Sequence, residues 1–331
     1  MFRYEAPKPT QYSFFSLSTS KRIGQIILPA QRRPHQTISY DALELFASEN
    51  NLIITPGIVA THDGAELDTL ELLSQFETEK QINEQYYIVK FNGNGMHYND
   101  LLTIHAETAN RLDTNIIAFD YRGVGASTQT PTTFNDLVTD GIAQVQRLLD
   151  EGVDSEKITL DGTSLGGGVA TMVAHHFHKI GKPVYLWNDR SFASISQAAT
   201  GMVASEAPGI FNDIYNSSVA CLSWSGLGST GWNAYVAKAY NEIPAKYKSY
   251  MYVAKKSARS GGDGVIVHPA SLHRGVKSTE KAKGQFTGYK FYTASADTKG
   301  HNLARTQLIS ATNSEQNAQD VFDSFVRSHR K

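Results

Sequence analysis

The feature that most constrains the fold of this chain is an alternation of short apolar runs with helix-length segments. The apolar runs are Tyr86–Phe91, Asn115–Phe119, Lys157–Leu160, Val184–Trp187, Tyr250–Ala254 and Tyr289–Thr293. They do not alternate strictly between apolar and polar residues, which is typical of strands covered on both faces. The helix-length segments are Asn99–Leu112, Phe134–Glu151, Leu165–Lys179 and the region from Ala270 on, with Gln316–Arg327 as a terminal helix. This order predicts an α/β fold, with a mainly parallel sheet and helices on both faces.

Two segments before these runs have other patterns. Residues Leu52–Leu72 are apolar-rich on both sides of Asp63-Gly64, which predicts an antiparallel hairpin at the edge of the sheet. The opening stretch to about Gln36 is predicted to be irregular, with one strand-like piece at Arg22–Leu28. We therefore divide the chain into an N-terminal extension over residues 1–47 and one α/β domain over residues 48–331. An insert at about 196–244 interrupts that domain.

Composition excludes several classes of protein. Lys and Arg number 31 against 32 Asp and Glu, so the net charge of -1 gives no electrostatic reason to expect a nucleic-acid partner. The one Cys, Cys221, excludes an intrachain disulfide and a Cys-rich zinc site. No apolar run is long enough to span a membrane, and the first residues lack the pattern of a Sec signal. We expect a soluble, cytoplasmic protein, although export without such a signal stays open, and the sequence identifies no protein partner.

The strongest chemical signal follows the run Lys157–Leu160. Gly162-Thr163-Ser164-Leu165-Gly166 lies between that run and a helix-length segment. A nucleophile on a sharp strand-to-helix turn needs small neighbours, which Gly162 and Gly166 provide. Ser164 is therefore predicted to be a nucleophile, and the amide of Leu165 is placed at a helix N-terminus where it can face a developing oxyanion.

A glycine-rich loop after Tyr86–Phe91 is the second signal. Gly93 and Gly95 allow the loop to approach the nucleophile closely, so we pair the amide of Asn94 with that of Leu165 as oxyanion donors. A third loop contains Asp120 and Arg122, which we expect to brace the site. Its glycines lack the dinucleotide-binding spacing, and the chain contains no phosphate-binding Gly-Lys-Ser/Thr motif, so no cofactor and no metal are expected.

A Ser nucleophile requires a general base and a third group that orients the base. Among eleven His residues, His301 lies in a polar loop after the last apolar run, which is the place of the base in such a fold. His175, His176 and His178 fall on the helix after Ser164, too far along it. His97 and His268 lie in loops that can border the site, and His268 is kept in reserve.

The acid is expected between nucleophile and base in the chain. Asp263, in a Gly-flanked loop after Tyr250–Ala254, is the first choice. Asp189, directly after Val184–Trp187, is the main alternative, because the acid can also come from the preceding strand end. Asp297 shares a loop with His301 and is the weakest of the three.

Together, the segments YYIVKFNGNGMHY, IIAFDYRGVGAS, ITLDGTSLGGGVA, VYLWNDRSFAS, GGDGVIVHPASL and KGHNLA resemble the α/β-hydrolase superfamily. Gly93-Asn94-Gly95 and Asn188-Asp189-Arg190-Ser191-Phe192 are similar to loops of the α/β-hydrolase-domain lipases and of acylglycerol or phospholipid hydrolases. The resemblance implies an eight-stranded, mostly parallel sheet and a triad of Ser164, Asp263 and His301. Two residues depart from the pattern: Asn92 stands where many relatives have His, and Asp161 stands where an apolar residue is commoner.

The resemblance implies that the insert at about 196–244 forms a cap over the site. It is rich in large apolar side chains, namely Met202, Ile210, Phe211, Ile214, Tyr215, Trp224, Leu227, Trp232 and Tyr235. These favour an apolar acyl chain in the substrate, although packing of the cap explains most of them equally well. We expect an esterase that acts on a lipid or another acyl ester. An acyltransferase on the same triad and a non-catalytic binding protein with the same fold are the alternatives.

Overall fold

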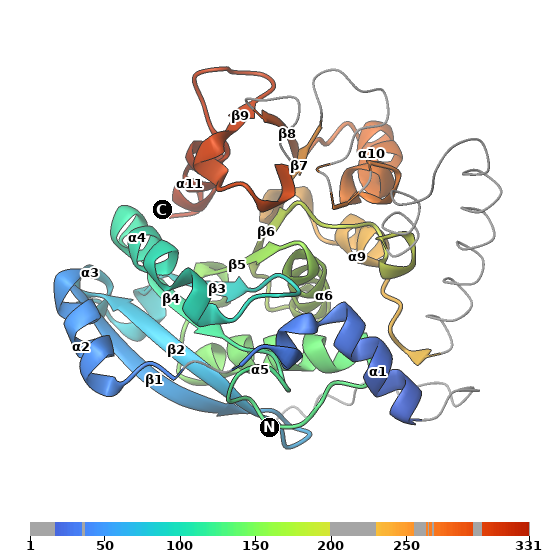
Figure 1. Cartoon of the computed structure of the whole chain (residues 1–331). Coiled ribbons are helices and arrows are strands. Elements are labelled where there is room, and N and C mark those ends of the chain that lie inside the picture. Colours follow the sequence, from blue (N-terminus) through green and yellow to red (C-terminus); the bar gives the residue numbers. More distant parts are fainter. Residues whose placement is uncertain are drawn as a thin grey trace.

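The computed structural model describes residues 17–34, 37–198, 230–254, 263, 265–266, 268–293 and 300–330. These residues form a nine-stranded sheet (Figure 1). Its strands are β1 (Leu52–Ala60), β2 (Glu66–Ser74), β3 (Tyr87–Phe91), β4 (Asn115–Phe119), β5 (Ile158–Thr163), β6 (Tyr185–Asp189), β7 (Lys248–Val253), β8 (Gly288–Thr293) and β9 (Leu308–Ser310). They lie in the order β1-β2-β4-β3-β5-β6-β7-β8-β9.

Strands β3 to β8 are parallel, and antiparallel strands complete the sheet at both edges. At one edge β1 pairs with β2 and β2 with β4; at the other β8 pairs with β9. All six apolar runs are strands, and the hairpin turns at Thr61–Gly64, where Gly64 has a φ of 87°. The mostly parallel α/β sheet expected from the sequence is confirmed. It has nine strands and not eight, because the three-residue strand β9 is too short to show a pattern.

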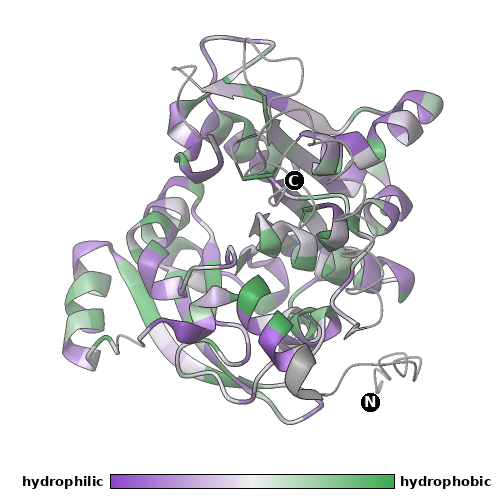
Figure 2. Cartoon of the chain, turned by 45° about the vertical axis from the view of Figure 1, so that its right-hand side comes forward, coloured by the Kyte–Doolittle hydropathy of each residue, from purple (hydrophilic) through white to green (hydrophobic). Residues whose placement is uncertain are grey.

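Helices cover both faces of the sheet, as Figure 1 shows. The described helices are α1 (Leu17–Ile27), α2 (Tyr40–Glu49), α3 (Gln75–Thr78), α4 (Leu102–Leu112), α5 (Phe134–Asp150), α6 (Leu165–Lys179), α9 (Val236–Glu242), α10 (Leu272–Lys283) and α11 (Ala318–Ser328). In Figure 2 they carry both hydrophobic and hydrophilic segments, as amphipathic helices do. None of the helices in these described ranges is long and apolar enough to cross a membrane.

Two buried clusters correspond to the two faces. Residues of α5, α6, α9 and α10 form one cluster with the inward side chains of β3, β4 and β5, among them Phe91, Phe119 and Leu160. Residues of α4 and α11 form the other with Ile88, Ile116 and Trp187. Neighbouring strand residues such as Ile88 and Val89 therefore pack into opposite cores, which is why the strand sequences do not alternate in polarity.

The strand-like piece expected at Arg22–Leu28 is a helix, so that prediction is wrong. Ile23 and Ile27 are four residues apart and pack on the same cluster as the buried Leu28, as one face of a helix does. Gly24 lies against Trp232, where a side chain would collide with the indole. The helical spacing of these residues determines the local structure, and the β propensity of the Ile-rich run does not.

Candidate active site

Ser164 is on a sharp turn between β5 and α6. Its backbone has φ 56° and ψ -116°, outside both the helical and the extended regions. A non-glycine residue in such a conformation costs about 1–3 kcal/mol and persists only where its surroundings impose it. The amide of Ser164 donates to the carbonyl of Asp189 at 2.8 Å, and its side chain is half-buried. The strained turn thus places Ser164 at the carboxyl edge of the sheet, directly after β5.

Two glycines allow this turn to pack closely. A Cβ at Gly162 would lie 2.3 Å from the carbonyl oxygen of Gly166, and one at Gly166 would lie 2.0 Å from that of Phe91. Both contacts are with backbone, which cannot rotate away. Glycine is therefore required at each position, and the start of α6 lies directly against the end of β3.

The loop after β3 runs beside the Ser164 turn. A Cβ at Gly93 would lie 3.9 Å from the carbonyl oxygen of Thr163, so the two chain segments are neighbours. Asn92 is buried and donates from Nδ2 to the carbonyl of Phe119. Asn94 is exposed, and Leu165 is the buried first residue of α6.

The N-terminal segment contacts this loop. The amide of Ala30 donates to the carbonyl of Asn94 at 3.2 Å, and the guanidinium of Arg33 donates to the carbonyl of Gly95 at 2.7 Å. Arg33 also forms a two-pronged ion pair with Asp100, which accepts from the amide of His97. Residues assigned to an extension by sequence therefore support the loop that carries Asn94.

The structure brings His301 and Asp263 together. Nδ1 of His301 lies 2.6 Å from Oδ2 of Asp263, and both side chains are buried. The other carboxylate oxygen, Oδ1, accepts the amides of Val265 and Ile266 at 3.0 and 2.7 Å. The amide of His301 donates to the Asp263 carbonyl. Because an ionised carboxylate accepts a hydrogen bond from Nδ1–H, the proton of the neutral ring stays on Nδ1 and the other ring nitrogen, Nε2, is left as the acceptor.

Asp189, the alternative acid, has different partners. Its carboxylate accepts from Nε of Arg190 at 2.6 Å and from Nε of Arg305 at 2.9 Å. Arg305 also forms a two-pronged pair with Asp161, and Lys90 donates to Asp161 at 2.7 Å. Lys90 and Asp161 are partners in the β3–β5 register. Asp297, the third candidate, lies outside the described residues.

The cations keep both carboxylates charged. Burial alone would raise the pKa of Asp161, but Arg305 and Lys90 outweigh it and hold the pKa of that carboxyl below its ordinary value. Burial is likewise outweighed at Asp189 by Arg190 and Arg305, which lower its pKa. Lys90, Arg190 and Arg305 were not predicted from the sequence to be site residues. The signal that was available is charge within a buried strand, since such a charge must be paired.

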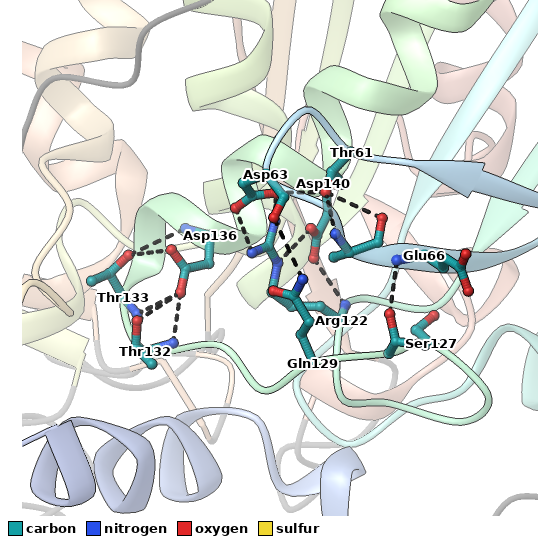
Figure 3. Close-up of polar contacts among 12 residues, drawn as sticks. Thr61, Asp63, Glu66, Arg122, Ser127, Gln129, Thr132, Thr133, Asp136 and Asp140 are labelled. Atoms are coloured by element: carbon teal, nitrogen blue, oxygen red, sulfur yellow. Dashed lines mark hydrogen bonds and ion pairs between the residues drawn. The ribbon is translucent and has the colours of Figure 1, made fainter.

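Asp120 and Arg122, expected to brace the site, belong to two different sets of contacts. Asp120 accepts from the amide of Tyr98, just after the loop that follows β3, and lies 3.3 Å from Nδ1 of His97. Figure 3 shows Arg122 between Asp140 of α5 and Asp63 of the β1–β2 turn. Arg122 therefore ties the sheet edge to α5.

The structure also describes other histidines and insert residues that were considered from the sequence. His175 and His178, on α6, contact Glu242 and the carbonyl of Val184. Of the large apolar residues of the insert, Trp232 and Tyr235 are described; Trp232 is fully buried against α1, whereas Tyr235 is exposed. Within the described residues, no group of three His, Cys, Asp or Glu side chains is placed to hold a metal ion.

The sheet order and the Ser164 turn define the class of fold. A parallel sheet with a strained Ser between strand and helix is the α/β-hydrolase fold. A family model described as alpha/beta hydrolase fold matches residues 93–185, which include Gly93-Asn94-Gly95 and the Ser164 turn.

Individual proteins support the same fold. The chain is 35% identical over 92 residues to a putative alpha/beta hydrolase of Acanthamoeba polyphaga mimivirus, and that match spans 28% of the chain and 35% of the relative. An α/β-hydrolase of Vibrio vulnificus superposes with a TM-score of 0.57 at 16% identity, covering 90% of this chain and 92% of the other. An esterase of Pyrococcus furiosus superposes with a TM-score of 0.56 at 14% identity, covering 90% and 97%.

Proposed function

We propose that this chain is a serine hydrolase that cleaves a carboxylic ester through an acyl-Ser164 intermediate. The observation that carries the proposal is the hydrogen bond between His301 and Asp263. It supports His301 as the base and Asp263 as its orienting acid, because the carboxylate of the alternative, Asp189, is bonded to Arg190 and Arg305. Both follow strands at the carboxyl edge of the sheet, where β5 ends in the strained Ser164.

The roles follow from the chemistry of each group. His301 Nε2 takes the proton of the Ser164 hydroxyl as Oγ attacks the ester carbonyl, and the amides of Leu165 and Asn94 donate to the resulting oxyanion. The protonated His301 then gives its proton to the departing alkoxide, leaving an acyl-Ser164. Water, deprotonated by His301, attacks this ester and releases the carboxylic acid. Asp263 stays ionised throughout and stabilises the imidazolium.

The substrate we favour is an ester with an apolar acyl chain, as the composition of the insert indicates. The esterase of Pyrococcus furiosus shares the fold at low identity, and its name is consistent with an ester substrate. Hydrolysis of p-nitrophenyl esters of graded chain length tests this preference. A maximum for short chains would contradict the lipid class and leave the esterase proposal intact.

A fluorophosphonate probe tests the nucleophile. The wild-type chain should be labelled, and Ser164→Ala should not be. Ser324→Ala is the matched control, because that hydroxyl lies on α11 and donates to the carbonyl of Asp320. Equal labelling of wild type and Ser164→Ala would overturn the proposal. Analysis of products with added alcohols then separates hydrolysis from acyl transfer.

A further inference from the structure

Arg190 links β6 to the loop that carries His301. It follows β6 directly, is buried, and has a φ of 48°, a second non-glycine residue in the left-handed region close to Ser164 in the fold. Its guanidinium uses Nε and one terminal nitrogen for the carboxylate of Asp189. The other terminal nitrogen, Nη1, shares its two hydrogens among three carbonyls of the base loop, those of Gly300, His301 and Leu303, at 2.9, 2.9 and 2.7 Å.

The same Asp189 also contacts the nucleophile turn. Its carbonyl accepts the amide of Ser164, while its carboxylate orients Arg190. Arg305, which follows the His301 loop in the chain, joins Asp189 to Asp161, three residues before Ser164 on β5. The segments that carry Ser164 and His301 are thus both fixed to one residue, Asp189.

We propose that Arg190 is a positioning residue, which sets the His301 main chain at a fixed place relative to Ser164. This inference rests on the proposed function. Charge-assisted hydrogen bonds in a buried site are short and strong, and three of them converge on one turn of backbone. A planar guanidinium can hold a carboxylate with one side and the loop with the other, whereas an ammonium is a single point of charge.

The first test compares Arg190→Met with Arg190→Lys. Asp189 keeps Arg305 in both variants, so neither leaves that carboxylate without a cation. Because misplacement of a catalytic group by about 1 Å costs about a hundredfold in rate, we expect Arg190→Met to lower kcat for p-nitrophenyl acetate by about ten- to a hundredfold, with KM nearly unchanged. Arg190→Lys should recover part of the loss. Arg111→Met is the matched control, because Arg111 joins α4 to Asp323 of α11 away from the site. The kcat of this variant should equal that of the wild type.

A double-mutant cycle separates positioning from general destabilisation. If Arg190 acts through His301, adding Arg190→Met to His301→Ala should leave the rate of fluorophosphonate labelling within about twofold of His301→Ala alone. An equal fold-loss in both backgrounds would overturn the inference, as would a wild-type kcat in Arg190→Met. Should Arg190→Met fail to fold, the same cycle is run with Arg190→Lys. If the wild-type chain is not labelled at Ser164, the proposed function itself is refuted.

Discussion

The main-chain carbonyl of Asp189 accepts the amide of Ser164 at 2.8 Å, so the end of β6 fixes the turn at the end of β5. The side chain of Asp189 points to Arg190 and Arg305 and not to His301. The backbone and the side chain of Asp189 therefore have different roles, which the sequence alone could not distinguish. Its backbone supports the Ser164 turn, and its carboxylate belongs to the buried ionic network, while Asp263 contacts the imidazole of His301.

The two carboxylates should consequently respond differently to amidation. Asp263→Asn removes the negative charge beside Nδ1 of His301 and favours the wrong tautomer, so we expect kcat to fall by about 10²–10⁴-fold with little change in stability. Asp189→Asn keeps its carbonyl on Ser164 but weakens two ion pairs, so we expect a loss of about 2–4 kcal/mol in unfolding free energy and a smaller loss of kcat. Steady-state kinetics and urea unfolding measure both. The assignment of the acid is wrong if Asp263→Asn retains more activity than Asp189→Asn.

Gly166 offers a test of the close packing at the nucleophile turn. Its added Cβ would lie 2.0 Å from the Phe91 carbonyl oxygen, so Gly166→Ala must push α6 away from β3. This moves the amide of Leu165 relative to that of Asn94, and we expect a loss of about 2–4 kcal/mol in stability together with a large loss of kcat. Gly57→Ala is the control, because a Cβ there meets nothing within 4 Å. Wild-type stability and kcat in Gly166→Ala would contradict the packing.

The strands and the turn at Ser164 could be predicted because their signals are local. Each buried strand is a short apolar run, and Ser164 lies in a five-residue pattern at the end of one of them. Helix α6 begins and ends at the predicted residues, Leu165 and Lys179. The helix α1 was mistaken for a strand because its few Ile residues fit both periods, and packing against Trp232 decides between them.

The ionic network could not be predicted, because its contacts join distant parts of the chain. Arg190 and His301 are 111 positions apart, and Arg305 and Asp161 are 144 apart. Only the sheet register places Lys90 beside Asp161. The sequence does contain the anomaly, since Asp161 departs from the apolar residue common at that position, but an anomaly does not identify its partners.

The contacts of Arg33 predict an effect of the N-terminal segment on catalysis. Arg33→Met removes the donor to Gly95 and the pair with Asp100, and loosens the loop that carries Asn94. The ion pair is partly exposed, so stability should change by about 1 kcal/mol or less, whereas kcat should fall by about three- to tenfold. Salt should lower kcat of the wild type more than that of the variant. Arg32→Met is the control, because Arg32 is the exposed neighbour of Arg33 in the chain. An equal kcat in Arg33→Met and Arg32→Met would contradict a role for Arg33.

The burial of His105 leads us to predict that the free energy of unfolding depends on pH. His105 lies on α4, is 2% exposed, and neither of its ring nitrogens has a hydrogen-bond partner in the described part of the chain. Burial, with a smaller contribution from Lys90, lowers the pKa of His105 to about 3. In the unfolded chain its pKa is about 6.5. Between these values the unfolded state binds the additional proton, so the free energy of unfolding falls as the pH decreases from 6.5 towards 3.

Replacing His105 with an apolar residue should remove this contribution. A difference of about 1.5 pH units below 6.5 corresponds to about 2 kcal/mol, so His105→Leu should be stabilised relative to the wild type by about 2 kcal/mol more at pH 5 than at pH 8. Urea unfolding at the two pH values measures the difference. Gln75→Leu is the control, because that side chain is exposed and does not titrate, so its replacement should give the same change at both pH values. If the change for His105→Leu is also the same at pH 5 and pH 8, His105 is not held neutral in the folded protein.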